Sequence, residues 1–210
     1  MKTHSMKTTI RNLFLTTATL LSAGYGASAQ EMLPREEAMR YALLAALNEP
    51  AQIQAPFRVD IDVKRPVAGY DGDYGALVLP ETKLSAKTFE QIGAAVIPVG
   101  QLWLKKLTPM EDGSAIDASR LQLVSIWVDG ENHSVPVCHL GVARRATGAL
   151  ELCIYGKGKE PMLRVPMKPI QKPQALPIEL SAEREYDSGK VTLRFAGCYE
   201  ATFSLTELPE

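Results

Sequence analysis

The chain has 210 residues, a formal net charge of -1 and a hydrophobic fraction of 46%. This length suits one domain or two small ones and is enough to bury a real core. The near-neutral charge lacks the basic footprint of a nucleic-acid-binding protein, so we expect no nucleic acid partner.

Residues 1–29 are typical of a cleavable secretory signal peptide. Basic residues come before any acidic residue, an apolar run follows from Leu13 to Leu21, and Ala27-Ser28-Ala29 offers the small side chains that a signal peptidase accepts. The alternative, an N-terminal membrane anchor, needs about 20 apolar residues, and this run is shorter. We therefore predict an exported protein, periplasmic or secreted, that begins at Gln30 and has no transmembrane segment in its mature chain.

The mature chain is predicted to open with a helix from Pro34 to about Asn48. Met39, Leu43 and Leu47 recur every fourth residue and form one apolar face. Such a face packs against the core or binds a partner, and the first interpretation is favoured.

The rest of the first half mixes strands with turns. Apolar and charged residues alternate from Phe57 to Val63, which predicts a strand with one solvated face. A Gly- and Asp-rich loop, 69–75, is expected to lead into a strand at 76–79. Ser85 is a suitable N-cap for a short helix to about Ile92. The segment 95–107 is predicted to be a strand interrupted at Pro98 and Gly100.

The second half is almost continuously strand-like, and turn residues divide it into short segments. The predicted strands are 121–128, 135–142, 150–155, 162–165, 178–180, 191–195 and 199–205. The proline-rich stretch 161–177 is expected to be an extended crossover, because proline removes donors from a sheet.

These elements predict a mostly β (α+β) fold with an antiparallel β-sandwich-like body, an N-terminal amphipathic helix and one further short helix. Residues 30–119 form a helix-plus-strand part and residues 120–210 an antiparallel β-rich part. The two are separate or make one continuous domain.

Three cysteines lie in the predicted mature chain, in a compartment where thiols oxidise. Their odd number allows one disulfide. Cys153 and Cys198 fall on the more polar faces of their strands and Cys138 on an apolar one, so we favour a Cys153–Cys198 bridge. Buried free thiols are the alternative.

A hairpin that turns at Ala146 and Thr147 would pair 140 with 152 and 142 with 150. The same register places His139 opposite Cys153, with Glu151 two residues along on that face. Imidazole, thiolate and carboxylate are ligands for transition metals, so His139, Cys153 and Glu151 are candidate metal ligands. The alternatives are a Cys153–His139 nucleophilic pair and a half-exposed sheet face with no chemistry.

The segment Asp71-Gly72-Asp73 resembles part of a calcium loop but lacks its remaining ligands, so a hydrated acidic turn is favoured. The sequence contains no cofactor fingerprint that we can identify, and none is expected. We predict a non-enzymatic binding or structural module of the cell envelope, with an envelope or extracellular protein or polysaccharide as partner. The alternative is an extracytoplasmic hydrolase with its site at loop 69–75 or loop 129–134.

Overall fold

The computed structural model describes residues 31–52, 56–128, 130–185 and 188–209. The predicted signal peptide, residues 1–29, and the predicted first mature residue, Gln30, lie outside the described residues. Within that part the fold is mostly β, with two antiparallel sheets and two α-helices. This confirms the predicted mostly β class with an N-terminal helix and one further short helix.

The helices are α1 (Arg35–Gln52) and α2 (Ala86–Glu90), with a 3₁₀ turn at Ala118–Arg120. The strands are β1 (Glu31–Met32), β2 (Val67–Asp71), β3 (Tyr74–Pro80), β4 (Ile97–Lys105), β5 (Leu107–Glu111), β6 (Ser114–Ala115), β7 (Gln122–Val128), β8 (Glu131–Arg144), β9 (Leu150–Tyr155), β10 (Leu163–Pro166), β11 (Lys168–Pro169), β12 (Ile178–Glu185), β13 (Ser188–Phe195) and β14 (Tyr199–Glu207).

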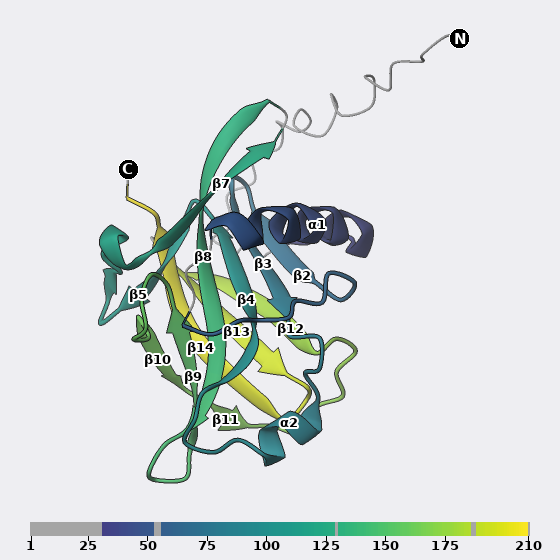
Figure 1. The fold of residues 1–210 in the computed structure, drawn as a ribbon, viewed down its shortest axis with the longest axis vertical. Helices are drawn as coiled ribbons and strands as arrows, with labels where there is room; N and C mark the ends of the chain where they lie inside the picture. The colour runs from purple at the N-terminus through teal and green to yellow at the C-terminus, as the bar shows by residue number, and fades with distance from the viewer. Residues whose placement is uncertain (1–30, 53–55, 129, 186–187, 210) are drawn as a thin grey trace, which may run out of the picture.

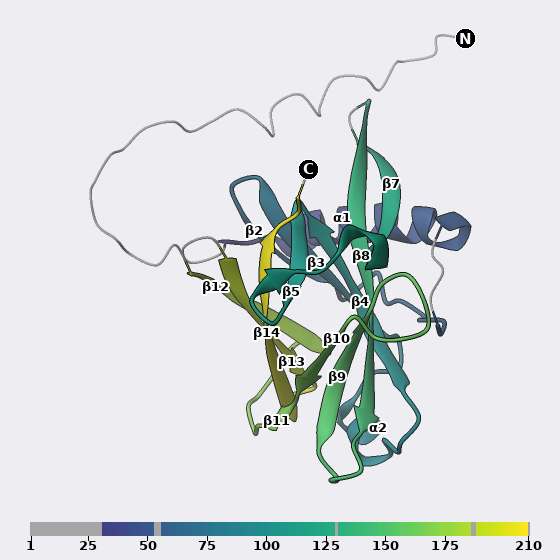
Figure 2. The ribbon, with the colours of Figure 1, turned by 90° about the vertical axis from the view of Figure 1, so that its left-hand side faces the viewer.

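Two antiparallel sheets contain these strands. The large sheet has the order β1-β2-β3-β4-β8-β9-β10, with β7 pairing to the first half of β8. The small sheet has the order β12-β13-β14-β5-β6, with β11 pairing to β14. Both sheets contain strands from before and from after residue 120. Figure 2 shows β12, β13 and β14 on one side of the molecule and β4, β8 and β9 on the other.

One large hydrophobic cluster takes side chains from both sheets. The large sheet contributes Leu102, Leu140 and Leu152, and the small sheet contributes Leu193 and Phe195, all fully buried. Because successive strand residues point to opposite faces, the alternate residues of the large sheet form a second surface on the far side of the cluster. We call this second surface the outer face.

Helix α1 covers part of the outer face, and it does so with a different side from the one that we predicted. Ala42 and Ala45 are buried against Trp103, whereas Leu43 is 52% exposed and Leu47 is 78% exposed. Small alanine side chains let the helix approach the sheet closely, and the bulky indole fills the space between them. The expectation that Leu43 and Leu47 pack into the core is therefore wrong.

The predicted strand at 57–63 is also wrong. Its residues run over the outer face and make one isolated bridge, between Ile61 and Glu81. Ile61 and Val63 pack against the cluster beneath α1, and Phe57 packs edge-on against the ring of Tyr155. The alternating apolar residues therefore cover the sheet and do not extend it.

Several other predicted elements are confirmed. Ser85 is the N-cap of α2 and forms a capping box with Thr88. β9 has the predicted bounds, and the β4–β8 register shifts between Pro98 and Gly100. The proline-rich stretch crosses between the sheets, because β10 pairs with β9 in the large sheet and β11 pairs with β14 in the small one.

Candidate functional site

The sequence-predicted site residues lie on the outer face of the large sheet, but in a different register from the one predicted. His139 pairs with Tyr155, and Cys153 pairs with Gly141. The connection is longer than a two-residue turn, since the Arg145 N–H donates to Ala149 O at 2.8 Å. The register shifts by two residues, and because an even shift preserves the face, His139 and Cys153 still share it.

His139 is held in a buried polar chain. Trp103 Nε1 donates to Gln101 Oε1 at 3.0 Å, and Gln101 Nε2 lies 3.3 Å from His139 Nε2. The amide nitrogen can only donate, so Nε2 of the imidazole accepts and Nδ1 carries the hydrogen. Nδ1 is buried and has no hydrogen-bond partner within the described residues.

Burial also determines the charge of this imidazole. His139 is 1% exposed, and burial lowers its pKa to about 4. The ring is therefore neutral near pH 7. In this form Nε2 accepts a hydrogen bond from Gln101, and the ring packs edge-on against Phe57. This arrangement suits a structural histidine that water does not reach.

Glu151 is almost fully buried between two arginines. Arg145 and Arg164 each donate to its carboxylate, one to each oxygen. Burial acts to raise the pKa of Glu151, but these hydrogen bonds outweigh it and hold the pKa below its usual value. The charged carboxylate is thereby compensated on both oxygens. Sequence reasoning missed both arginines, because Arg145 lies in the loop after β8 and Arg164 lies on the neighbouring strand β10.

Cys153 lies beside this ion-paired group. Its sulfur is 3.6 Å from Arg164 Nη1 and 3.9 Å from Glu151 Oε1. Burial and then the charge of Glu151 raise the pKa of the thiol. A buried, protonated thiol is a poor nucleophile, so the geometry does not favour the Cys153–His139 catalytic pair.

The three candidate metal ligands do not converge. In the part of the chain that the structure describes, no group of three or more His, Cys, Asp or Glu side chains is arranged to hold a metal ion. Glu151 is occupied by two arginines and His139 Nε2 by Gln101. In the acidic turn, Asp71 pairs with Arg184 and Asp73 with Lys106.

The cysteines are unpaired, so the favoured Cys153–Cys198 bridge is wrong. Cys153 lies on the large sheet, whereas Cys198 lies in the β13–β14 turn of the small sheet and donates to Ala196 O at 3.3 Å. The alternation of apolar and polar residues placed both cysteines on polar strand faces. It does not indicate that the two strands belong to different sheets.

We expect iodoacetamide to label one thiol per native chain, at Cys198, and three after denaturation. Cys138 and Cys153 are fully buried, and burial raises the pKa of Cys138 to about 12. Intact mass spectrometry before and after unfolding counts the labels. If the native chain gained no label, and two or more labels appeared only after reduction, the protein would instead contain a disulfide.

A cleft of about 380 Å³ lies between the two sheets, at the end where the β2–β3 and β12–β13 hairpins approach each other. Its lining includes the apolar side chains of Ala76, Leu107, Ala182, Val191 and Leu205. The polar and charged lining residues are Asp71, Tyr74, Glu183, Arg184, Ser188, Thr206 and Glu207. The cleft therefore combines an apolar floor with a charged rim.

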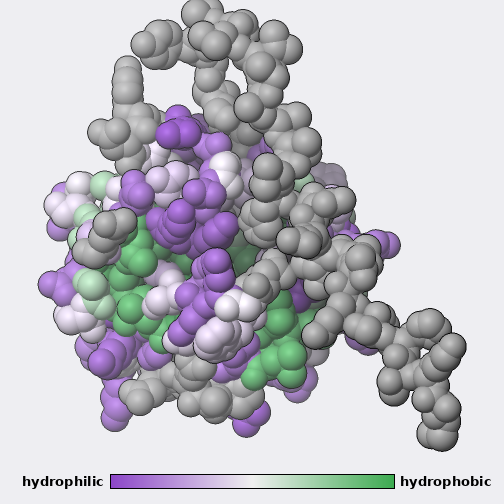
Figure 3. All heavy atoms as spheres, turned by 90° about the horizontal axis from the view of Figure 1, so that it is seen from above, coloured by the Kyte–Doolittle hydropathy of each residue, from purple (hydrophilic) through white to green (hydrophobic). Residues whose placement is uncertain are grey.

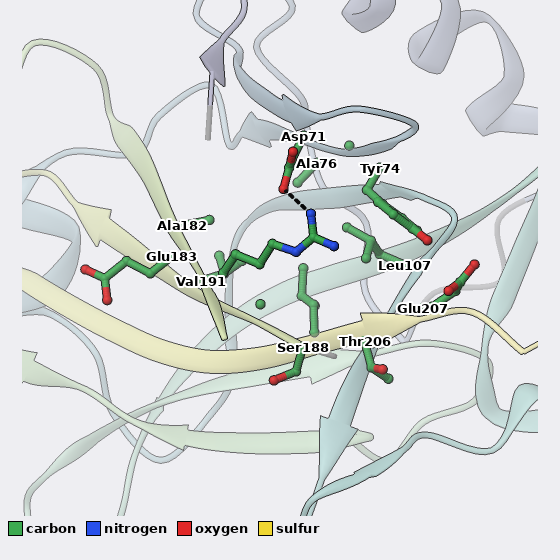
Figure 4. Close-up of a pocket in the computed structure, with 14 residues that line it drawn as sticks. Asp71, Tyr74, Ala76, Leu107, Ala182, Glu183, Ser188, Val191, Thr206 and Glu207 are labelled. Atoms are coloured by element: carbon green, nitrogen blue, oxygen red, sulfur yellow. Dashed lines mark hydrogen bonds and ion pairs between the residues drawn. The ribbon is translucent and has the colours of Figure 1, made fainter. Parts of the chain in front are cut away.

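Hydrogen bonds and one ion pair organise the rim. Arg184 Nη1 lies 3.2 Å from Asp71 Oδ2. A hydrogen bond to Glu207 raises the pKa of Tyr74, whose ring borders the same opening. Figure 4 shows Tyr74 and Glu207 on one side of the cleft, Asp71 near Ala76, and Glu183 pointing away from the centre.

The two loops that the sequence singled out have different positions. Asp71 and Tyr74 of the first loop line the cleft, and the loop is a tight hairpin with Gly72 at a φ of 59°. The second, 129–134, is at the tip of the β7–β8 hairpin, with residue 129 outside the described residues. Sequence reasoning missed Arg184, which is 113 residues from Asp71 and carries no local motif.

Comparisons with protein-family models, curated proteins and solved structures find no match for this chain. None of the helices in the described segments is long and apolar enough to cross a membrane.

Proposed function

We propose that the protein is an exported, non-enzymatic binding module of the cell envelope, with a sandwich-like body that holds a ligand in the cleft between its sheets. The cleft carries the proposal. It has about 380 Å³, an apolar floor and a few polar groups at the rim, which is the usual form of a small-molecule site. Export rests on the sequence of residues 1–29.

The rim favours a positively charged ligand. Among the lining carboxylates, Asp71 pairs with Arg184, Glu207 accepts a hydrogen bond from Tyr74, and Glu183 points away from the centre (Figure 4). An amine gains Glu207 as a partner without breaking the ion pair, whereas an anion has to displace Asp71 from Arg184. The proposed ligand is therefore a small amphipathic amine, whose apolar body covers Leu107 and Val191.

The hydrolase alternative with its site at loop 69–75 or loop 129–134 stays a prediction, whereas the Cys153–His139 catalytic pair has little support from the geometry. His139 is neutral and buried, and the Cys153 thiol is buried and protonated, so neither is placed to attack a substrate. The expected protein or polysaccharide partner stays a prediction.

Octylamine and octanoate make a matched pair of probes, because they share an alkyl chain and differ in charge. We expect octylamine to shift the NMR signals of cleft residues saturably and octanoate to shift them much less. Equal binding of both probes would contradict the amine preference. Binding of neither at the cleft would contradict the ligand site itself.

A second measurement tests the role of the rim carboxylate. Glu207→Gln is expected to weaken octylamine binding about fivefold, which corresponds to the loss of about 1 kcal/mol for an exposed charge pair. Glu200→Gln is the matched control, since it changes the same charge on the same strand outside the cleft lining. Equal losses in the two variants would point to a general effect of net charge.

A further inference from the structure

The β7–β8 hairpin extends from the body as an arm, which is clear in both ribbon views (Figures 1 and 2). In the described part of the chain, β8 is the strand that pairs with β7. β7 is seven residues long, and the segment Leu121–Val128 contains no charged residue and no proline. Sheet edges are normally protected by charge, proline or short length, so this strand has the features of one that pairs with another strand.

The side chains of β7 are arranged symmetrically about its middle residue, Ser125. On one face Leu123 is 42% exposed and Trp127 is 68% exposed. On the other face Val124 and Ile126 are buried in the cluster beneath α1. Each face therefore carries one apolar residue on either side of Ser125.

We propose that β7 pairs antiparallel with β7 of a second copy of this chain, with the two-fold axis at Ser125. In this register Leu123 lies opposite the partner subunit's Trp127, and Val124 lies opposite the partner subunit's Ile126. Cross-strand neighbours on one face are in contact, so the exposed leucine and tryptophan of each chain become covered. The two large sheets then continue into each other through an isologous interface.

A second copy fits this edge better than other partners, because one register satisfies both faces at once. A slip by one residue would place the exposed pair opposite residues that face the helix side. No charged side chain on β7 needs a counter-charge from a partner. The β7–β8 hairpin extends beyond the body (Figure 2), and α1 covers only the face of β7 that carries Val124 and Ile126.

Apolar residues also reach the surface elsewhere at this end of the molecule. Figure 3, which views the molecule from above Figure 1, shows apolar surface interrupted by hydrophilic residues. Leu43 and Leu47 are exposed on α1, the helix that packs on the outer face of the large sheet and contacts β7. Leu43 and Leu47 therefore add exposed apolar surface close to β7.

Cysteine cross-linking tests both the partner and the register. At the two-fold axis, the Cα atoms of residue 125 from two copies would be about 4.5–5.5 Å apart, which suits a disulfide. We expect Ser125→Cys to form a disulfide-linked dimer on mild oxidation. Ser134→Cys is the matched control, because Ser134 is exposed and faces Ser125 from β8 of the same chain. It should give much less dimer.

Sedimentation or light scattering of the wild-type chain completes the test. We expect a dimer that Trp127→Lys weakens at least about tenfold, as measured by the dissociation constant. The exposed position of Trp127 lets the variant fold, and circular dichroism checks that it does. A wild-type monomer at about 100 μM, far above the concentration that a specific interface needs, would overturn the proposal. Equal cross-linking at positions 125 and 134 would overturn it as well.

Discussion

Leu193→Ala is expected to lower the free energy of unfolding by about 3–4 kcal/mol, measured by urea or guanidinium titration. Leu193 lies in β13, is fully buried, and faces Leu180 and Ala201 on the two neighbouring strands. Its side chain belongs to the cluster that both sheets share. Removing it leaves a cavity that the surrounding strands close only in part, which adds to the lost burial of the leucine.

Leu47→Ala is the matched control, because it makes the same chemical change at a position that is 78% exposed. Alanine is also the better helix former, so the change in unfolding free energy should stay within about 0.5 kcal/mol. If both substitutions had the same effect, Leu193 would not lie in a core between the sheets. A large effect of Leu47→Ala alone would mean that the leucine face of α1 is the packed one.

The second large effect is a dependence of stability on pH that arises from His139. Its pKa is about 4 in the folded protein, against about 6.5 for an unperturbed histidine. Between these values the unfolded chain binds a proton that the folded chain does not, so stability rises with pH. The free energy of unfolding is therefore expected to fall by about 3 kcal/mol in total as the pH decreases from 6.5 to 4. Above pH 6.5 this loss is absent.

Urea titrations at a series of pH values would measure this loss. His139→Gln should remove the slope between pH 6.5 and 4, whatever its effect on stability at pH 7. His133→Gln is the matched control, because His133 is exposed on the arm, and it should keep the slope of the wild type. If His139→Gln kept the slope, its cause would lie in another group. Glu151, whose pKa lies below its usual value, contributes mainly at the acid end of the range.

Local patterns predicted many strands well and failed where a segment lies on top of a sheet. The alternation in β9 predicted its bounds, because a strand that is paired on both sides follows the pleat of its neighbours. The same alternation from Phe57 to Val63 predicted a strand that does not form. Its apolar side chains pack on the outer face, and a period of two does not distinguish covering a sheet from joining it.

The candidate site was predictable only in part. Alternation correctly placed His139, Cys153 and Glu151 on one face, although the wrong loop length shifted their register by two residues. The arginines that neutralise Glu151 were not predictable from spacing, because Arg164 reaches this carboxylate from the neighbouring strand β10. In the structure Glu151 forms a buried ion-paired group with Arg145 and Arg164, and the neutral His139 lies further along the same face.

The sequence by itself determined the mostly β class, the capped helix at Ser85 and the crossover imposed by five prolines between 161 and 177, because propensity, capping and proline geometry act over a few residues. Tertiary structure alone decided which side of α1 is buried, which sheet holds each cysteine, and that Asp71 meets Arg184 at the rim of a cleft. These contacts join segments far apart in the chain. They depend on how side-chain volumes fit together between and upon the sheets, and no local pattern encodes that fit.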